Sequence, residues 1–322
     1  MKYFFCKSNR IIVLPDMAFQ RIDNFLHARL KGVPRSMIYR ILRTGIVRIN
    51  QKRTKPQYKL QNGDEIKLPY VEIRSQQHKI DIGKKTFCAK LEDLILYEDD
   101  YVIGINKPSG LAVHGGSGLR FGVIEALRAL RPNTSFLELV HRLDRATSGV
   151  LLLAKKRSSL RMLHEQFREK TIKKEYLALV QGEWPTHITV IDAPLLKSIN
   201  INNSRIMRVH KEGKPSTTLF KIEEKYKKIA TLVKVSLITG RMHQIRVHAL
   251  HAGHPIALDD RYGSNEFHQT LRDIGLQRLF LHANTLSFIH PHNGKNIFII
   301  APLDQKLKKF LEKLRSLVKT TL

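Results

Sequence analysis

The chain has 322 residues, of which 42% are hydrophobic, so it can form two domains with packed cores and is not a disordered tail. Lys and Arg number 56 against 28 Asp and Glu, and the formal net charge of +28 indicates a polyanionic partner, with nucleic acid favoured over an anionic membrane surface. Two cysteines, Cys6 and Cys88, exclude a disulfide framework or a four-cysteine zinc site, and no apolar run reaches the length of a membrane span, so a cytoplasmic location is expected.

The positive charge is concentrated in the N-terminal part of the chain. Residues 1–90 hold 20 Lys or Arg and 6 Asp or Glu, a net of +14, which is half of the total charge in less than a third of the length. This asymmetry predicts a dedicated binding module ahead of a larger domain.

Two short helices and two short strands are predicted within this module. Residues 21–31 carry an apolar stripe at helical spacing, and a second helix is expected from an N-cap at Ser36 through Leu42. Residues 46–50 and 65–68 predict strands, the second of them after a tight Asn-Gly-Asp turn.

Three arginines, Arg35, Arg40 and Arg43, cluster around the second predicted helix. They could form an ordinary solvated face, but their density favours RNA binding. The module also resembles the RNA-binding domain named after small-subunit ribosomal protein S-four, with one departure at Gln51, where that family usually has Gly. The segments that carry this resemblance are 21–26, 45–50 and 63–66.

The domain order follows from these patterns. We expect an N-terminal extension at residues 1–17, the RNA-binding domain at 18–74, a basic linker at 75–90 and a larger domain at 91–322. In the larger domain, strands are expected at 94–97, 102–105, 150–154, 176–180, 231–237 and 297–300, and helices at 122–130, 158–170 and 304–319. Strands and helices do not alternate regularly, which predicts an α+β fold with a mixed, mostly antiparallel β-sheet flanked by helices.

A loop rich in ionisable residues precedes the expected strand at 150–154. It spans residues 141–149, His-Arg-Leu-Asp-Arg-Ala-Thr-Ser-Gly. A loop held by a rigid strand is where a positioned carboxylate is expected, so Asp144 is the candidate catalytic residue. By composition alone, the more ordinary interpretation is that this aspartate accepts a hydrogen bond within a local turn.

The loop belongs to a series of blocks that together resemble one enzyme family. Its pattern is similar to the signature of RluA-type pseudouridine synthases, and further blocks of that family lie at 106–114, 174–180, 240–248, 253–256 and 260–263. Two more segments, 163–170 and 193–197, are closest to the RluC branch, which modifies large-subunit ribosomal RNA. The sequence departs from the pattern at Ala146, where Asp is expected in that branch, and at Leu258, where the wider family often has Gly.

This resemblance implies an isomerase that converts specific uridines of large-subunit ribosomal RNA to pseudouridine. The uridine would leave its stack, and its uracil would detach from ribose C1′ and rejoin through C5. Nothing is added or lost, so no cofactor is expected. Asp144 would be the catalytic carboxylate; whether it attacks C1′, attacks the base or only stabilises charge stays open at this point.

The resemblance also implies roles for other residues. Arg246 is expected to pair with Asp144, Tyr176 to stack on the target base, and Arg142 to contact the RNA or fill the gap that the nucleotide leaves. Lys107 is expected to contact RNA. From the residues alone, Arg246 would be one more RNA contact and Tyr176 an ordinary core aromatic.

Other interpretations have less support from the sequence. No metal is expected, because the spacing of four neighbouring histidines matches no zinc motif: His243, His248, His251 and His254. A metal-dependent nuclease would rely on the paired acids at 99–100 or 259–260, and a non-catalytic ribosome-assembly factor would use the basic surface without Asp144. The expected partner is ribosomal RNA, free or in an assembling particle, and the protein is expected to be a monomer with no obligatory protein partner and no membrane association.

Overall fold

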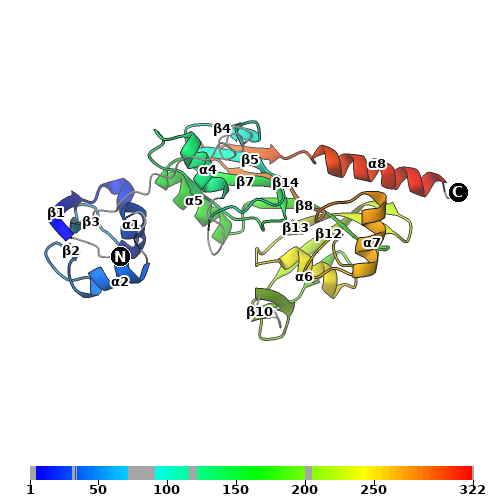
Figure 1. Ribbon diagram of the computed structural model, residues 1–322, viewed down its shortest axis with the longest axis horizontal. Coiled ribbons are helices and arrows are strands. Elements are labelled where there is room, and N and C mark those ends of the chain that lie inside the picture. Colours follow the sequence, from blue (N-terminus) through cyan, green and yellow to red (C-terminus); the bar gives the residue numbers. More distant parts are fainter. Residues whose placement is uncertain are drawn as a thin grey trace. The chain divides into compact units, whose positions relative to one another are not determined.

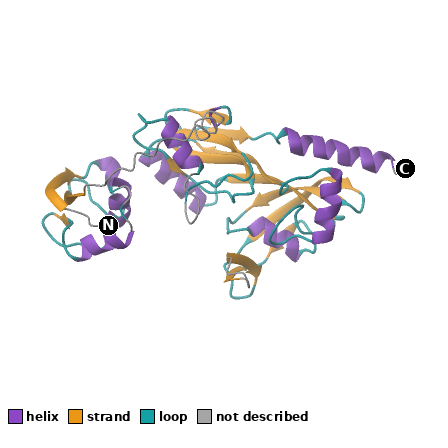
Figure 2. Ribbon diagram, viewed as in Figure 1, coloured by secondary structure: helices purple, strands orange, loops and turns teal. Residues whose placement is uncertain are grey.

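The structure is a computed structural model that describes residues 5–30, 33, 35–71, 91–115, 122–199 and 205–320 (Figure 1). The chain divides into two compact units, Met1–Ile82 and Gly83–Leu322, and each has its own hydrophobic core. Figure 2 distinguishes the helices and strands of both units. The basic linker expected at 75–90 lies outside the described residues. None of the described helices is long and apolar enough to cross a membrane.

The first unit combines two helices with a three-stranded antiparallel sheet of order β1-β3-β2. Its elements are β1 (Phe5–Ile12), the 3-10 turn η1 (Pro15–Met17), α1 (Ile22–Arg29), α2 (Arg35–Arg43), β2 (Arg48–Ile49) and β3 (Glu65–Val71). Two details differ from the sequence-based expectation. Helix α2 begins at Arg35, so Ser36 lies within the helix and is not its N-cap, and the expected extension at 1–17 contributes β1 to the sheet.

The turn after β2 has Gln51 at the position where the S-four pattern favours glycine. Asn50 and Gln51 both have positive φ values, 48° and 64°, and Ile49 bridges to Lys52 across the turn. Asn50 Nδ2 also donates to Asp64 Oδ1 at 2.8 Å. Asn tolerates the left-handed region and these bonds support it, so the turn accommodates a glutamine at its second position.

The second unit is built on a ten-stranded mixed sheet of order β4-β5-β7-β14-β8-β13-β12-β9, with β15 paired to β14 and β6 paired to β7. The strands are β4 (Ile95–Glu98), β5 (Val102–Lys107), β6 (Glu138–Leu139), β7 (Ser148–Ala154), β8 (Lys173–Gln181), β9 (Val190–Asp192), β12 (Thr217–Tyr226), β13 (Ala230–Leu237), β14 (Leu281–Ile289) and β15 (Asn296–Ile300). A separate hairpin consists of β10 (Leu195–Ile199) and β11 (Arg205–Val209). The helices are α4 (Val123–Leu130), α5 (Arg157–Arg168), α6 (Gln244–His251), α7 (Asn265–Ile274) and α8 (Gln305–Thr320). The expected α+β fold with a mostly antiparallel sheet is confirmed.

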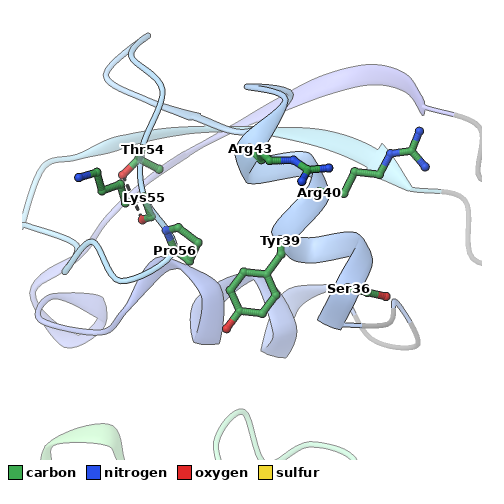
Figure 3. Close-up of a pocket in the computed structure, with 7 residues that line it drawn as sticks. All are labelled: Ser36, Tyr39, Arg40, Arg43, Thr54, Lys55 and Pro56. Carbon is green, nitrogen blue, oxygen red and sulfur yellow. Dashed lines mark hydrogen bonds between the residues drawn. The ribbon is translucent and has the colours of Figure 1, made fainter.

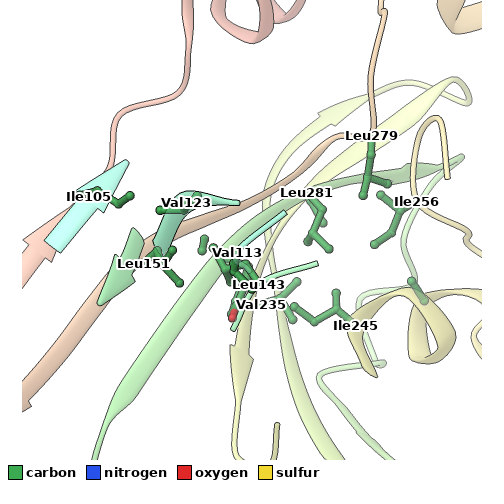
Figure 4. Packing of buried hydrophobic residues seen from close by; sticks show 14 of the residues in the cluster. Ile105, Val113, Val123, Leu143, Leu151, Val235, Ile245, Ile256, Leu279 and Leu281 are labelled. Atoms are coloured by element: carbon green, nitrogen blue, oxygen red, sulfur yellow. The ribbon is translucent and has the colours of Figure 1, made fainter. Parts of the chain in front are cut away.

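Helices cover both faces of this sheet, and β8 shows how its side chains divide between them. Tyr176, Ala178 and Val180 pack in the cluster that includes the apolar residues of α4 and α6, part of which is drawn in Figure 4. Leu179 faces the other way, toward the cluster that includes α7 and α8. Leu143, the neighbour of Asp144, is buried in the cluster on the Tyr176 side. The candidate catalytic loop is therefore anchored on the same face of the sheet as Tyr176.

The one parallel strand pair among the described strands places a glycine at the end of that loop. Strand β7 pairs with β14 through His282 opposite Ser148 and Ala283 opposite Gly149. Gly149 has a φ of +110°, and a side chain there would overlap the main chain of Ala283. Only glycine satisfies both conditions, which explains the Gly that closes the loop.

Candidate active site

The loop that carries Asp144 is fixed by the segment that follows β5. Ser109 Oγ donates to the carbonyl oxygen of Ala146 at 2.6 Å, and the amide of Gly110 donates to the carbonyl oxygen of Arg145 at 2.8 Å. Arg145 Nε in turn donates a hydrogen bond to the carbonyl oxygen of Gly110 at 2.9 Å. The bonds from Ser109 and Gly110 are accepted by main-chain carbonyls, so this support does not require the aspartate that was expected at Ala146.

Lys107, which was expected to contact RNA, belongs to this support. Its side chain is 0% exposed, and Nζ donates to the carbonyl oxygens of Pro108 and Leu111 at 2.9 Å and of Arg145 at 3.2 Å. Burial and a neighbouring guanidinium lower the pKa of Lys107 to about 7, and the charge of Asp144 opposes them. Three acceptors require three N–H groups, which the ammonium form supplies. With its Nζ directed at these three carbonyl oxygens, Lys107 supports the loop, and the expected RNA contact stays a prediction.

A single guanidinium connects three carboxylates beside the loop. Arg246, on α6, donates through Nε and Nη2 to both oxygens of Asp259, at 2.7 and 2.6 Å. Nη2 also reaches Asp260 Oδ1 at 3.2 Å, and Nη1 reaches Asp144 Oδ2 at 3.4 Å. The structure thus brings Arg246 to Asp144, but the bidentate pair forms with Asp259. Burial lowers the pKa of Arg246, and the bonds and charge of Asp259 more than offset this, so the guanidinium stays charged.

The side chain of Asp144 is partly exposed to solvent. It is 27% exposed, and Oδ2 faces both Arg246 and His243, whose Nε2 lies 3.7 Å away. Within the described parts of the chain, Oδ1 accepts no hydrogen bond. One carboxylate oxygen is thus held by the protein, and the other is available to a substrate.

The other expected site residues lie at different depths. Tyr176 is buried on β8, and burial, followed by the negative charge of Asp144, raises the pKa of its hydroxyl, which therefore stays protonated. Arg142 is exposed. Sequence reasoning missed Asp259 and His243 as neighbours of this centre. The signal for Asp259 was present, because a buried arginine needs a buried acid, but the sequence does not say which acid it is.

The histidines and paired acids do not assemble into a metal site in the part of the chain that the structure describes. His248 Nε2 pairs with the Ala193 carbonyl at 3.0 Å, and His254 Nδ1 pairs with the Gln181 carbonyl at 2.7 Å. Asp259 is committed to Arg246. These residues are therefore used in holding the fold and the site together.

The first unit carries a basic pocket of about 390 Å³. Figure 3 shows its lining, in which Arg40 and Arg43 project from α2 and Lys55 comes from the loop that follows β2. Tyr39 forms part of the lining and is 45% exposed. The side chain of Arg35 lies outside what the structure describes. Two of the three expected RNA-binding arginines therefore share one pocket.

In comparisons with known proteins, each of the two units matches its own family model. Residues 101–251 match the family described as RNA pseudouridylate synthase, and residues 20–66 match the S4 domain. The chain is 60% identical over 308 residues to "Ribosomal large subunit pseudouridine synthase C" of Salmonella typhi, covering 95% of this chain and 96% of that one. It is 59% identical to the protein of the same name from Escherichia coli K12, with the same coverage. Among solved structures, "Human RNA Pseudouridylate Synthase Domain Containing 4" is 25% identical with a TM-score of 0.60, covering 72% of this chain and 97% of that one.

Proposed function

Because the chain belongs to the RNA pseudouridylate synthase family, we propose that it isomerises specific uridines of large-subunit ribosomal RNA, with Asp144 as the catalytic carboxylate. The observation that carries this proposal is that only one of the two carboxylate oxygens of Asp144 has a partner among the described residues. Oδ2 is held by Arg246, while Oδ1 accepts no hydrogen bond from the described residues, so one carboxylate oxygen is oriented by the protein and the other is left for a substrate. The names of the relatives from Salmonella typhi and Escherichia coli support the choice of RNA.

In the proposed reaction, Oδ1 of Asp144 acts on a uridine that has left its stack. It serves as nucleophile or as the negative charge that stabilises the sugar while the C1′–N1 bond breaks and the C1′–C5 bond forms. Any bond from Oδ1 to the substrate breaks again in this second step, C5 loses its proton to solvent and N1 takes up a proton, so the product is an isomer of uridine. Arg246 keeps the carboxylate oriented through its contact with Oδ2. Tyr176 stacks on the base, with its hydroxyl kept protonated, and Arg142 contacts the RNA that the uridine leaves.

The first unit supplies affinity in this proposal. Arg35, Arg40 and Arg43 neutralise phosphates, and the excess of positive charge over the whole chain attracts the polyanion. The protein acts as a monomer in the cytoplasm. The substrate is ribosomal RNA or its precursor.

The decisive experiment replaces one oxygen of the carboxylate. Asp144→Asn keeps the shape of the side chain and removes its charge, so the variant should bind RNA with native affinity and release no tritium from RNA labelled at uridine C5. Asp260→Asn is the matched control, because Asp260 touches the same guanidinium but is 80% exposed, and it should keep native turnover. Turnover by Asp144→Asn would disprove the catalytic role, and pseudouridine maps of ribosomal RNA with and without the gene test the substrate.

A further inference from the structure

His243 has an unusual backbone conformation where the chain enters α6. Its φ of 55° and ψ of 19° are left-handed, a conformation that costs a non-glycine residue on the order of 1 kcal/mol. The next residue holds this turn. Gln244 Oε1 accepts from Thr239 Oγ1 at 2.8 Å and from the Arg241 amide at 3.0 Å, and its Nε2 donates to two acceptors on β12. The strained backbone therefore has a support that fixes the direction of the His243 ring.

A chain of hydrogen bonds reaches His243 from the β10–β11 hairpin. The amide of Met207, on β11, donates to the hydroxyl oxygen of Tyr262 at 2.9 Å. That hydroxyl lies 2.8 Å from His243 Nδ1. The opposite ring nitrogen, Nε2, lies 3.7 Å from Asp144 Oδ2. Four residues thus connect a main-chain amide of the hairpin to the candidate catalytic carboxylate.

The direction of these bonds fixes the tautomer of His243. The hydroxyl oxygen of Tyr262 already accepts from the Met207 amide, so its single proton is best used toward His243 Nδ1. Nε2 then carries the imidazole proton and presents an N–H group to Asp144. The other tautomer would turn a lone pair toward a negatively charged oxygen. Burial lowers the pKa of His243, against an opposing contribution from Asp144, so the ring is neutral at neutral pH.

The same turn supports both neighbours of Asp144 Oδ2. Asp259 forms the bidentate pair with Arg246, and its Oδ1 also accepts from the amide of Tyr262 at 3.1 Å. The ring of Tyr262 faces the guanidinium, with 5.1 Å between Arg246 Cζ and the ring centroid. Residues 259–262 therefore orient Arg246 directly and His243 through the Tyr262 hydroxyl.

We propose that Tyr262 and His243 are positioning residues for Asp144. Tyr262 keeps His243 as the Nε2–H tautomer, and this N–H group, together with Arg246, turns Oδ2 toward the protein and leaves Oδ1 for the uridine. The inference rests on the proposed function, because it assumes that Asp144 reacts.

Three substitutions test this arrangement by separating kcat from KM. Tyr262→Phe removes one oxygen, and His243→Asn tolerates the left-handed backbone but is too short to reach Asp144. Each should lower kcat by about tenfold with KM for RNA unchanged. The double variant should be no slower than His243→Asn alone, because Tyr262 acts through His243. His243→Gln can present an amide N–H at the place of Nε2 and should recover part of the lost kcat.

A spectroscopic measurement tests the tautomer of His243 without relying on turnover. Nitrogen NMR of histidine-labelled enzyme should show His243, assigned by its loss in His243→Gln, as the Nε2–H tautomer, and Tyr262→Phe should change it to a mixture. An Nδ1–H tautomer, or native kcat in Tyr262→Phe and His243→Asn, would overturn the inference. If Asp144→Asn keeps its turnover, the proposed function fails; if Asp144→Asn is inactive and these variants are fully active, only the positioning role fails.

Discussion

Arg246 forms its two shortest hydrogen bonds, of 2.6 and 2.7 Å, with Asp259 and touches Asp144 through Nη1 alone, at 3.4 Å. A bidentate pair fixes the plane of a guanidinium, whereas a single contact does not. Asp259 therefore determines where Arg246 points, and Nη1 is left in place to hold Oδ2 of Asp144. Asp259 thus supports the candidate active site indirectly, because Arg246 lies between it and Asp144.

Asp259→Asn should therefore damage both stability and turnover. The amide cannot balance a guanidinium that is 4% exposed, and breaking such a buried pair typically costs about 3–5 kcal/mol. We expect the free energy of unfolding of the second unit to fall by about that amount and kcat to fall by at least about tenfold. The only tryptophan, Trp184, is buried in this unit, so its fluorescence in urea reports the unfolding.

The control for that experiment is the neighbouring acid. Asp260 also contacts Arg246 but is 80% exposed, so Asp260→Asn should change the free energy of unfolding by less than about 1 kcal/mol. Equal losses in the two variants would contradict the special role of Asp259.

Charge reversal in the first unit should weaken RNA binding without changing the chemistry. The double variant Arg40→Glu/Arg43→Glu removes two cations from the pocket of Figure 3. If each contacts one phosphate, the slope of log affinity against log salt should become shallower by about 1.5 to 2. Titrations at several salt concentrations measure it, and kcat at saturating RNA should stay native.

A matched double reversal separates local binding from general charge. Lys308 and Lys309 are exposed on α8, and Lys308→Glu/Lys309→Glu changes the net charge of the chain by the same amount. A local pocket predicts a smaller loss of affinity for this pair. The same loss in both double variants would refute the pocket as an RNA contact.

The apolar patterns of the sequence predicted several of the strands that pack the core, but they missed β12 and β14, which also contribute buried apolar residues. Strands β5, β7 and β13 lie where alternating or continuous apolar runs placed them. Helix α6 was not predicted, because Gln244, Arg246 and His248 are all buried on it and interrupt the apolar stripe. Burial of these polar groups follows from tertiary contacts that have no local signature.

The same limit applies to the candidate site. Resemblance to a family identified Asp144, Tyr176 and Arg246, and the structure brings Arg246 within 3.4 Å of Asp144. Lys107 was expected to contact RNA because a lysine is ordinarily exposed, and only the fold shows that three carbonyl oxygens converge on it at the end of β5. Asp259 could not be separated from its exposed neighbour Asp260 by sequence alone.

Lys107→Met should loosen the loop of Asp144 while leaving RNA affinity unchanged. Methionine fills a similar volume but leaves the carbonyls of Pro108, Leu111 and Arg145 without their donor, at about 1–3 kcal/mol for each that stays buried and unsatisfied. We expect a loss of about 3 kcal/mol or more in the unfolding of the second unit, and a lower kcat. A weaker affinity for RNA with native stability would instead indicate a direct RNA contact.

His141, three residues before Asp144, should make the second unit sensitive to acid. Its Nε2 accepts a hydrogen bond from the Leu152 amide at 3.0 Å, so the ring is neutral in the folded protein. Burial, assisted by Lys174, lowers the pKa of His141 from 6.5 to about 3. Between these two values the unfolded chain binds a proton that the folded chain does not, so stability falls as the pH drops below about 6.5, by up to about 1.4 kcal/mol per pH unit from this group.

His141→Gln removes this titration, because the amide oxygen can accept the same hydrogen bond at any pH. Urea unfolding followed by Trp184 fluorescence between pH 4 and pH 7 should show a slope of stability against pH that is shallower in the variant by up to about 1.4 kcal/mol per pH unit. His251→Gln, at an exposed histidine of α6, is the control and should keep the native slope. Identical slopes in the native protein and His141→Gln would mean that His141 is not held neutral by Leu152.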